Sequence, residues 1–448
     1  MNKRLSFKQR IILGSTLFGM FFGAGNLIFP VHLGQLAGSN FIPAAIGFIA
    51  SAVVLPIAAV AAIGYSQADG LFELTSRISK RFGYIFTTLL YLTIGPFFAI
   101  PRCASVSFTT GFEPIFADSN PFVPMLLFSL LFFVVVLIFS LRPNKITTWI
   151  GKIINPVFLV FLFVLILMAV FTPGEPYTNI DPVSDYQTNA FFNGFLQGYG
   201  TMDAIAGLAF GIVVVNIVKN FGVKSNVNVA RDVARSGNHT AILMAVIYAL
   251  TIFMGAQSRG FLEISDNGGI ALSQIANHCF GPAGNIILAI TILLACLKTS
   301  IGLVTSCSST FCEMFPKKLN YKIWAIIFVL FSFAVSNVGL TAIIEYAVPV
   351  LNLLYAFSMV LILLTFVSKL FNNYKPVYII TFAFTLIPAL FEFVKTLPPN
   401  VIEYTSLQGA IDAYISVVPL ASMGLSWIIP AIIGFIIGFV VYLVKGRK

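Results

Sequence analysis

The chain has 448 residues, of which 58% are hydrophobic and only 9% are charged, whereas a soluble protein carries about 25% charged residues. This composition excludes a string of soluble domains and indicates one polytopic membrane domain over residues 1–448. The formal net charge of +10 falls in short polar breaks between apolar segments, which argues against a nucleic-acid-binding surface and makes the charge a topology signal.

The apolar segments predict an all-α protein with about twelve membrane-spanning helices. In chain order they lie near 11–36, 41–65, 83–112, 122–141, 148–171, 190–217, 238–257, 282–311, 321–337, 340–368, 375–395 and 423–444. Basic breaks alternate with acidic ones, and both chain ends are basic, so we expect both termini in the cytoplasm. Turn residues predict an outer loop over 172–188, and the polar inner segment 219–238 is expected to include a short surface helix.

The first predicted span contains Gly23-Ala24-Gly25-Asn26, within a stretch from Ile11 to Ala68 that has no Asp, Glu, Lys or Arg. Glycine costs about 1 kcal/mol relative to alanine inside a helix. A helix break in lipid is tolerable only where protein or a polar cavity satisfies the freed backbone groups. Broken helices of this kind hold substrates and ions in secondary transporters. The alternative is close helix packing through small residues.

The sixth predicted span repeats this feature, with Gly198, Gly200, Thr201 and Asp203 inside an apolar helix. Five spans form an odd-numbered unit, so a second unit of five is inverted relative to the first. Paired interruptions in corresponding positions of two halves indicate a transport site. A half-helix that starts at such a break presents free N–H groups to a carboxylate. One that ends there presents carbonyls to an ammonium group or a cation.

The eighth predicted span reads Cys296-Leu297-Lys298-Thr299-Ser300. The two hydroxyls are suitable oxygen ligands for a small hard cation, although hydroxyls also bond back to their own helix. A charge near mid-span is expensive and usually functional, so Lys298 is a candidate partner of Asp203 or a stand-in for a cation. A buried ion pair that fixes helix packing is the structural alternative. The five cysteines do not indicate disulfides, and the three scattered histidines offer no metal-ligand spacing.

Four stretches together resemble the bacterial branched-chain amino acid:cation symporters, the system II carriers. They are the residues 21–30 (FFGAGNLIFP), 95–102 (GPFFAIPR), 198–204 (GYGTMDA) and 297–302 (LKTSIG). The likeness runs from Leu5 to the C-terminus. It implies import of leucine, isoleucine and valine across the bacterial cytoplasmic membrane with Na⁺ or H⁺, and no enzymatic activity.

The resemblance also implies the leucine-transporter fold. Two inverted five-helix repeats are expected over about 9–171 and 189–368, with broken spans 1 and 6. Two further helices follow near 375–395 and 423–444. No cofactor is expected beyond the coupling ion, and no metal beyond Na⁺.

Site residues follow from the breaks and from the resemblance. The expected substrate-binding residues are Phe21, Gly23, Ala24, Gly25, Tyr199, Gly200, Thr201, Met202 and Asp203. The expected cation-binding residues are Gly19, Phe21, Phe22, Asn26, Thr201, Cys296, Thr299 and Ser300. Coupling to protons through Lys298 or Asp203 remains open. A channel or a membrane enzyme is the alternative of another class, although the sequence shows neither charged rings nor clustered catalytic groups.

Overall fold

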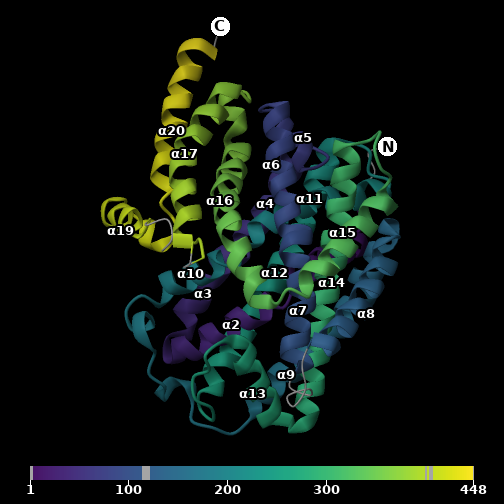
Figure 1. The fold of residues 1–448 in the computed structure, drawn as a ribbon, viewed down its shortest axis with the longest axis vertical. Helices are drawn as coiled ribbons and strands as arrows, with labels where there is room; N and C mark the ends of the chain where they lie inside the picture. The colour runs from purple at the N-terminus through teal and green to yellow at the C-terminus, as the bar shows by residue number, and fades with distance from the viewer. Residues whose placement is uncertain (1–3, 114–121, 399–400, 403–406, 447–448) are drawn as a thin grey trace.

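The computed structural model describes residues 4–113, 122–398, 401–402 and 407–446. Within these ranges the chain is helical, and most of the long helices run along the vertical axis of Figure 1. The first half comprises α1 (Phe7–Phe21), α2 (Gly25–Ala37), α3 (Phe41–Ala52), α4 (Val54–Tyr65), α5 (Leu71–Ser76), α6 (Lys80–Leu92), α7 (Ala99–Gly111), α8 (Phe122–Ser140) and α9 (Asn155–Phe171). The second comprises α10 (Ala190–Tyr199), α11 (Asp203–Asn220), α12 (Asn226–Ser258), α13 (Gly268–Phe280), α14 (Pro282–Met314), α15 (Tyr321–Ser336), α16 (Leu340–Val367), α17 (Lys375–Lys395), α19 (Gln408–Val417) and α20 (Ile428–Val441).

The predicted class, an all-α polytopic membrane protein, is confirmed. Ten helical stretches of the described chain are long and apolar enough to cross a membrane by themselves. Three other helices are shorter: α1, α10 and α15, the last of which has 16 residues. The number of crossings therefore stays a prediction.

Both predicted interruptions are present. The first span is split between α1 and α2, and the sixth is split between α10 and α11. The third span is also irregular, because residues Thr93–Phe97 form a π-helical turn in which Gly95 has φ −90° and ψ −114°. This turn reorients the chain before α7 and places α7 beside the first break.

One prediction about the inner surface was wrong. The polar segment 219–238 does not hold a separate surface helix, because α12 is continuous from Asn226 to Ser258. Its first turns bury Val229 and Val233, and the buried Asp232 accepts a hydrogen bond from the Leu5 N–H at 3.0 Å. Packing on this buried face outweighs the polar residues on the opposite face, so the segment joins the long helix and does not form a separate one.

Small residues bring the first half of span 6 onto span 2. A Cβ atom added to Gly194 of α10 would overlap the Ala44 carbonyl oxygen of α3, and one added to Gly47 would overlap the Phe191 carbonyl oxygen. The helices α2 and α12 meet in the same way at Gly34 and Gly255. Close approach through glycine is typical of helix pairs in membranes, where apolar burial alone does not drive association.

Candidate functional site

The first break leaves three residues, Phe22, Gly23 and Ala24, between α1 and α2. Phe22 has φ −80° and ψ 85°, which ends the helix. The Gly23 N–H donates both to the Phe21 carbonyl at 2.9 Å and to the Asn26 side-chain oxygen at 3.1 Å. These bonds fix the turn, and the first N–H groups of α2 are left without intrahelical partners.

The second break is held by local bonds and by one unusual backbone conformation. The Thr201 hydroxyl donates to the Gly198 carbonyl at 2.8 Å. Met202 is left-handed, with φ 57° and ψ 21°, although it is not glycine. That conformation costs a non-glycine residue roughly 1–2 kcal/mol. Backbone strain of this kind is typical of functional sites, where the surrounding structure enforces it.

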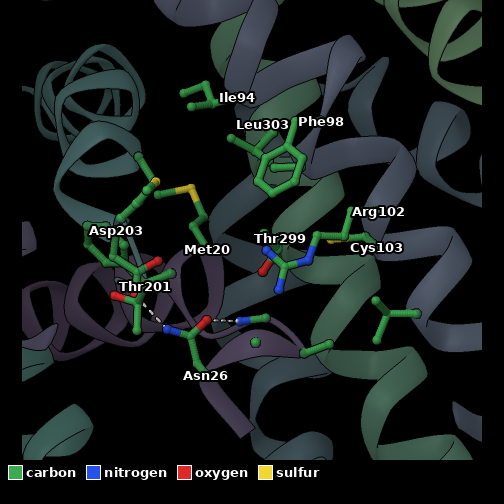
Figure 2. A pocket seen from close by; sticks show the side chains of 18 of the residues that line it. Met20, Asn26, Ile94, Phe98, Arg102, Cys103, Thr201, Asp203, Thr299 and Leu303 are labelled. Atoms are coloured by element: carbon green, nitrogen blue, oxygen red, sulfur yellow. Dashed lines mark hydrogen bonds between the residues drawn. The ribbon is translucent and has the colours of Figure 1, made fainter. Parts of the chain in front are cut away.

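Asn26 joins the two breaks. Its side-chain NH₂ group donates to Asp203 Oδ2 at 2.6 Å and to the Tyr248 hydroxyl at 2.7 Å. Figure 2 shows a dashed hydrogen bond at each end of this side chain, one of them to Asp203. Asn26 is 6% exposed, so the network lies inside the bundle. The amide thereby fixes α2, α11 and α12 relative to one another.

A cavity of about 100 Å³ lies between the breaks. Its polar lining comes from the first break and from Asn26, Arg102, Thr201, Asp203 and Thr299. The rest of the lining is largely apolar and includes Met20, Ile94, Phe98, Phe210, Leu303 and Leu351. Figure 2 shows Ile94, Phe98 and Leu303 gathered at one end of it. The arrangement is suited to a small ligand with an aliphatic part and a polar part.

The structure brings most of the expected substrate-binding residues to this cavity, namely Phe21, Gly23, Ala24, Gly25, Thr201, Met202 and Asp203. Tyr199 and Gly200 do not line it. They line a neighbouring cavity of about 280 Å³ on the other side of the second break, where the Tyr199 hydroxyl accepts a hydrogen bond from Trp427 Nε1 at 2.9 Å. Met202 lines both cavities, so the second break forms part of the wall between them.

The oxygens expected around a cation fall into two groups. The Phe21 carbonyl and the Asn26 side-chain oxygen both accept from the Gly23 N–H, so they lie close together. The hydroxyls of Thr299 and Ser300 are buried and have no hydrogen-bond partner in the described chain. A Cβ atom on Gly23 would lie 3.2 Å from Thr299 Oγ1, which places this hydroxyl against the first break.

The structure describes the surroundings of the other expected ligands, Gly19, Cys296 and Phe22, whose role stays a prediction. Gly19 packs against the fifth span, since an added Cβ would approach Ile150 at 2.5 Å and Asn155 at 3.6 Å. Cys296 is buried and is not in a disulfide. Phe22 stacks on Phe18 and on Tyr248, with ring centroids 5.0 and 5.4 Å apart.

Lys298 does not pair with Asp203, which corrects one of the two roles considered for it. Its ammonium donates to Asn155 Oδ1 at 3.1 Å and lies 3.3 Å from the ring centroid of Phe158. The rings of Phe18 and Phe22 lie 5.0 and 5.6 Å from the same nitrogen. The side chain is fully buried and does not line the cavity between the breaks.

Sequence reasoning missed the contribution of the third span to the cavity. Ile94, Phe98, Ala99, Cys103 and Val106 line it, together with Arg102. The Gly95-Pro96 pair within this span was a usable signal, because proline removes a helical hydrogen bond and bends the chain. The apolar residues themselves carried no such signal.

Comparison with known proteins identifies the family. The profile described as "Branched-chain amino acid transport protein" matches residues 6–445. The chain belongs to this family. It is 46% identical to a branched-chain amino acid permease of Lactobacillus delbrueckii subsp. lactis, over 98% of this chain and 97% of the relative. It is 39% identical to a Bacillus subtilis permease of the same description, over 100% of both chains. Members of this family are transport proteins, so the enzyme alternative is dropped.

Solved structures confirm the fold alone. A nucleobase-cation-symport-1 family transporter in a closed conformation superposes with a TM-score of 0.60 at 14% identity, covering 98% of this chain and 95% of the other. An Eremococcus coleocola manganese transporter superposes with a TM-score of 0.55 at 15% identity, covering 96% and 95%. The differing cargoes named for these two proteins indicate that the fold does not select the substrate.

Proposed function

We propose that this protein imports branched-chain amino acids by symport with Na⁺. The observation that carries the proposal is the cavity between the two breaks, with broken backbone on one side and aliphatic and aromatic side chains on the other. Leucine, isoleucine and valine have this same division into a zwitterionic head and an apolar side chain. The permease relatives carry the substrate class in their descriptions.

The substrate head belongs at the breaks. The N-terminus of α2 offers N–H groups and the positive end of a helix dipole to a carboxylate. Asp203 offers its carboxylate to the ammonium group, and its hydrogen bond from Asn26 holds it beside the first break. The aliphatic side chain of the substrate lies against Met20, Phe98 and Leu303.

The coupling cation belongs beside Thr299. Its hydroxyl and that of Ser300 are buried without partners, and an unsatisfied buried hydroxyl costs roughly 1–3 kcal/mol. A bound Na⁺ removes that cost by taking oxygen ligands from the two hydroxyls and from nearby carbonyls of the first break. The cation and the substrate then share the chain segment around Gly23, which couples their binding.

The architecture supports alternating access. Both halves of span 1 pack on α12, while α10 packs on α3 and α11 packs on α4. Each broken span therefore lies on the second span of the other five-helix unit, as expected for repeats over about 9–171 and 189–368. Rocking of one group of helices against the other exposes the cavity to each side in turn. The orientation that puts both termini in the cytoplasm comes from the basic breaks.

The test is counterflow of labelled leucine in proteoliposomes, with Na⁺ and pH gradients varied separately. We expect a Na⁺ gradient to drive accumulation and the Thr299→Ala/Ser300→Ala double variant to lose this dependence. A matched control is Thr291→Ala/Ser308→Ala on the same helix, since both hydroxyls already bond to their own helix, at 2.7 Å each. Unchanged Na⁺ dependence in the first double variant removes the cation assignment, and flux without accumulation indicates a channel.

Proton coupling is the second candidate, and one observation favours it. Asp203 forms no ion pair within the described chain, so it is a carboxylate that can bind a proton. Proton coupling predicts that, in the same proteoliposomes, a pH gradient drives accumulation of leucine in Na⁺-free buffer. Accumulation that requires Na⁺ and ignores the pH gradient excludes it.

A further inference from the structure

Arg102 stands at the junction of two cavities. It lines the cavity between the helix breaks and also a second one of about 500 Å³. The second cavity is bounded by residues of α7, by the start of α13 and by the start of α16, including Thr109, Asn267 and Gln274. A ligand that passes between the two cavities meets this side chain.

The guanidinium faces the first break. The Cζ atom of Arg102 lies 5.2 Å from the ring centroid of Phe98. Its Nη2 atom lies 3.3 Å from the position that a Cβ atom on Gly25 would take, so the group is beside the first residue of α2. In Figure 2 it points toward the middle of the cavity, opposite Asp203.

The charge on Arg102 has no carboxylate partner in the described chain and lies only over the Phe98 ring. The ion pairs among the described residues are Arg77–Glu73, Lys219–Asp69 and Lys395–Glu392, so the Arg102 guanidinium forms none. A charged side chain within a membrane span is expensive and is retained for function. A planar guanidinium matches a carboxylate through two parallel hydrogen bonds.

We propose that Arg102 binds the carboxylate of the substrate, together with the N–H groups at the start of α2. Asp203 on the opposite wall takes the ammonium group, so the two ends of the zwitterion are held by opposite charges across the cavity. This inference rests on the proposed function, and it adds a charged residue of the third span to a site built from spans 1 and 6. It predicts that recognition depends on the carboxylate charge through Arg102.

The experiment compares leucine with leucinamide, which keeps the side chain and the ammonium group but lacks the carboxylate. Displacement of labelled leucine from purified protein gives both affinities. We expect wild-type protein to prefer leucine, and Arg102→Gln to weaken leucine binding roughly 10- to 100-fold while leaving leucinamide unchanged. Arg102→Gln then no longer prefers leucine over leucinamide. Lys152→Gln, which removes one exposed positive charge of the fifth span, is the matched control and keeps the wild-type preference.

The outcomes are separable. Equal weakening of leucine and leucinamide in Arg102→Gln, or an unchanged preference, overturns the proposal and leaves the proposed function standing. Wild-type protein that binds no leucine overturns the proposed function itself. If Arg102→Gln does not purify as a folded protein, Arg102→Lys decides, because its compact charge cannot form the paired bonds. The proposal is then overturned if Arg102→Lys binds leucine as tightly as the wild type does and keeps the same preference for leucine over leucinamide.

Discussion

At the scale of single residues, Lys298 shows how this protein accommodates a fully buried cation. Its ammonium lies against the face of Phe158 and donates to Asn155, whose own NH₂ group donates to the Ser15 hydroxyl at 2.9 Å. A desolvated cation–π contact is worth about 2 kcal/mol or more. The charge thereby ties α14 to α1 and α9. We interpret it as a structural tie rather than a group that contacts the substrate.

This interpretation predicts that Phe158→Leu destabilises the protein. Loss of the ring removes the surface under the ammonium and leaves a partial cavity, so we expect the free energy of unfolding to fall by about 2 kcal/mol. Thermal unfolding in detergent measures it. The control is Phe163→Leu on the same helix, where the ring is 54% exposed and the expected change is within about 0.5 kcal/mol. Equal effects of the two substitutions would contradict the interpretation.

At the scale of elements, the two broken spans keep their halves in place through glycine contacts with neighbours. α10 has only ten residues, too few to be stable alone, so its position depends on packing against α3. Gly194 and Gly198 lie four residues apart and face α3 with no room for a side chain. The second break, and the cavity beside it, are positioned by this contact.

Gly194→Ala tests this dependence, and the chain provides a control of opposite sign. The added methyl group overlaps the Ala44 carbonyl, so we expect at least about 2 kcal/mol of destabilisation and loss of leucine uptake. Gly409→Ala in α19 meets no atom within 4 Å and is expected to be neutral or stabilising by up to about 1 kcal/mol. Thermal unfolding and uptake are measured for both. If Gly194→Ala leaves thermal stability and leucine uptake unchanged, this contact does not position α10.

At the scale of the whole molecule, the cavity lies where helices from both halves of the chain meet. Span 1 contributes Gly23 and Asn26, span 6 contributes Thr201 and Asp203, and α14 contributes Thr299. Asn26 of the first half donates a hydrogen bond to Asp203 of the second. A ligand in this cavity contacts both halves and therefore stabilises one arrangement of the helices over the others.

We accordingly predict mutual stabilisation by leucine and Na⁺. Leucine at about 100 times its dissociation constant stabilises the folded state by about 2.7 kcal/mol, and Na⁺ raises the affinity for leucine. Thermal unfolding with and without leucine, in Na⁺ and in choline, measures both effects. Linkage requires that leucine raise the affinity for Na⁺ by the same factor. A leucine-induced shift of equal size in the two salts would exclude coupling of the two sites.

Local sequence predicted the breaks well because glycine acts through the backbone of its own segment. The Gly23–Asn26 and Gly200–Asp203 segments are interrupted where the glycines indicated. The finer geometry was not predictable. The left-handed residue is Met202 rather than Gly200, and Gly198 serves close packing on Phe48 and Ser51. Those two outcomes depend on neighbouring helices.

For the charged residues inside the spans, too, the sequence determined one part and the tertiary structure another. The sequence alone determined that Arg102, Asp203 and Lys298 lie inside apolar spans, because a long apolar run is itself the signal of a membrane-spanning helix. It also determined the membrane class and the family. The tertiary structure alone decided the neighbours: Asn26 beside Asp203, aromatic rings around Lys298, and an unpaired guanidinium at the start of α2. Contacts between distant segments depend on how helices cross and rotate, and no local pattern encodes that.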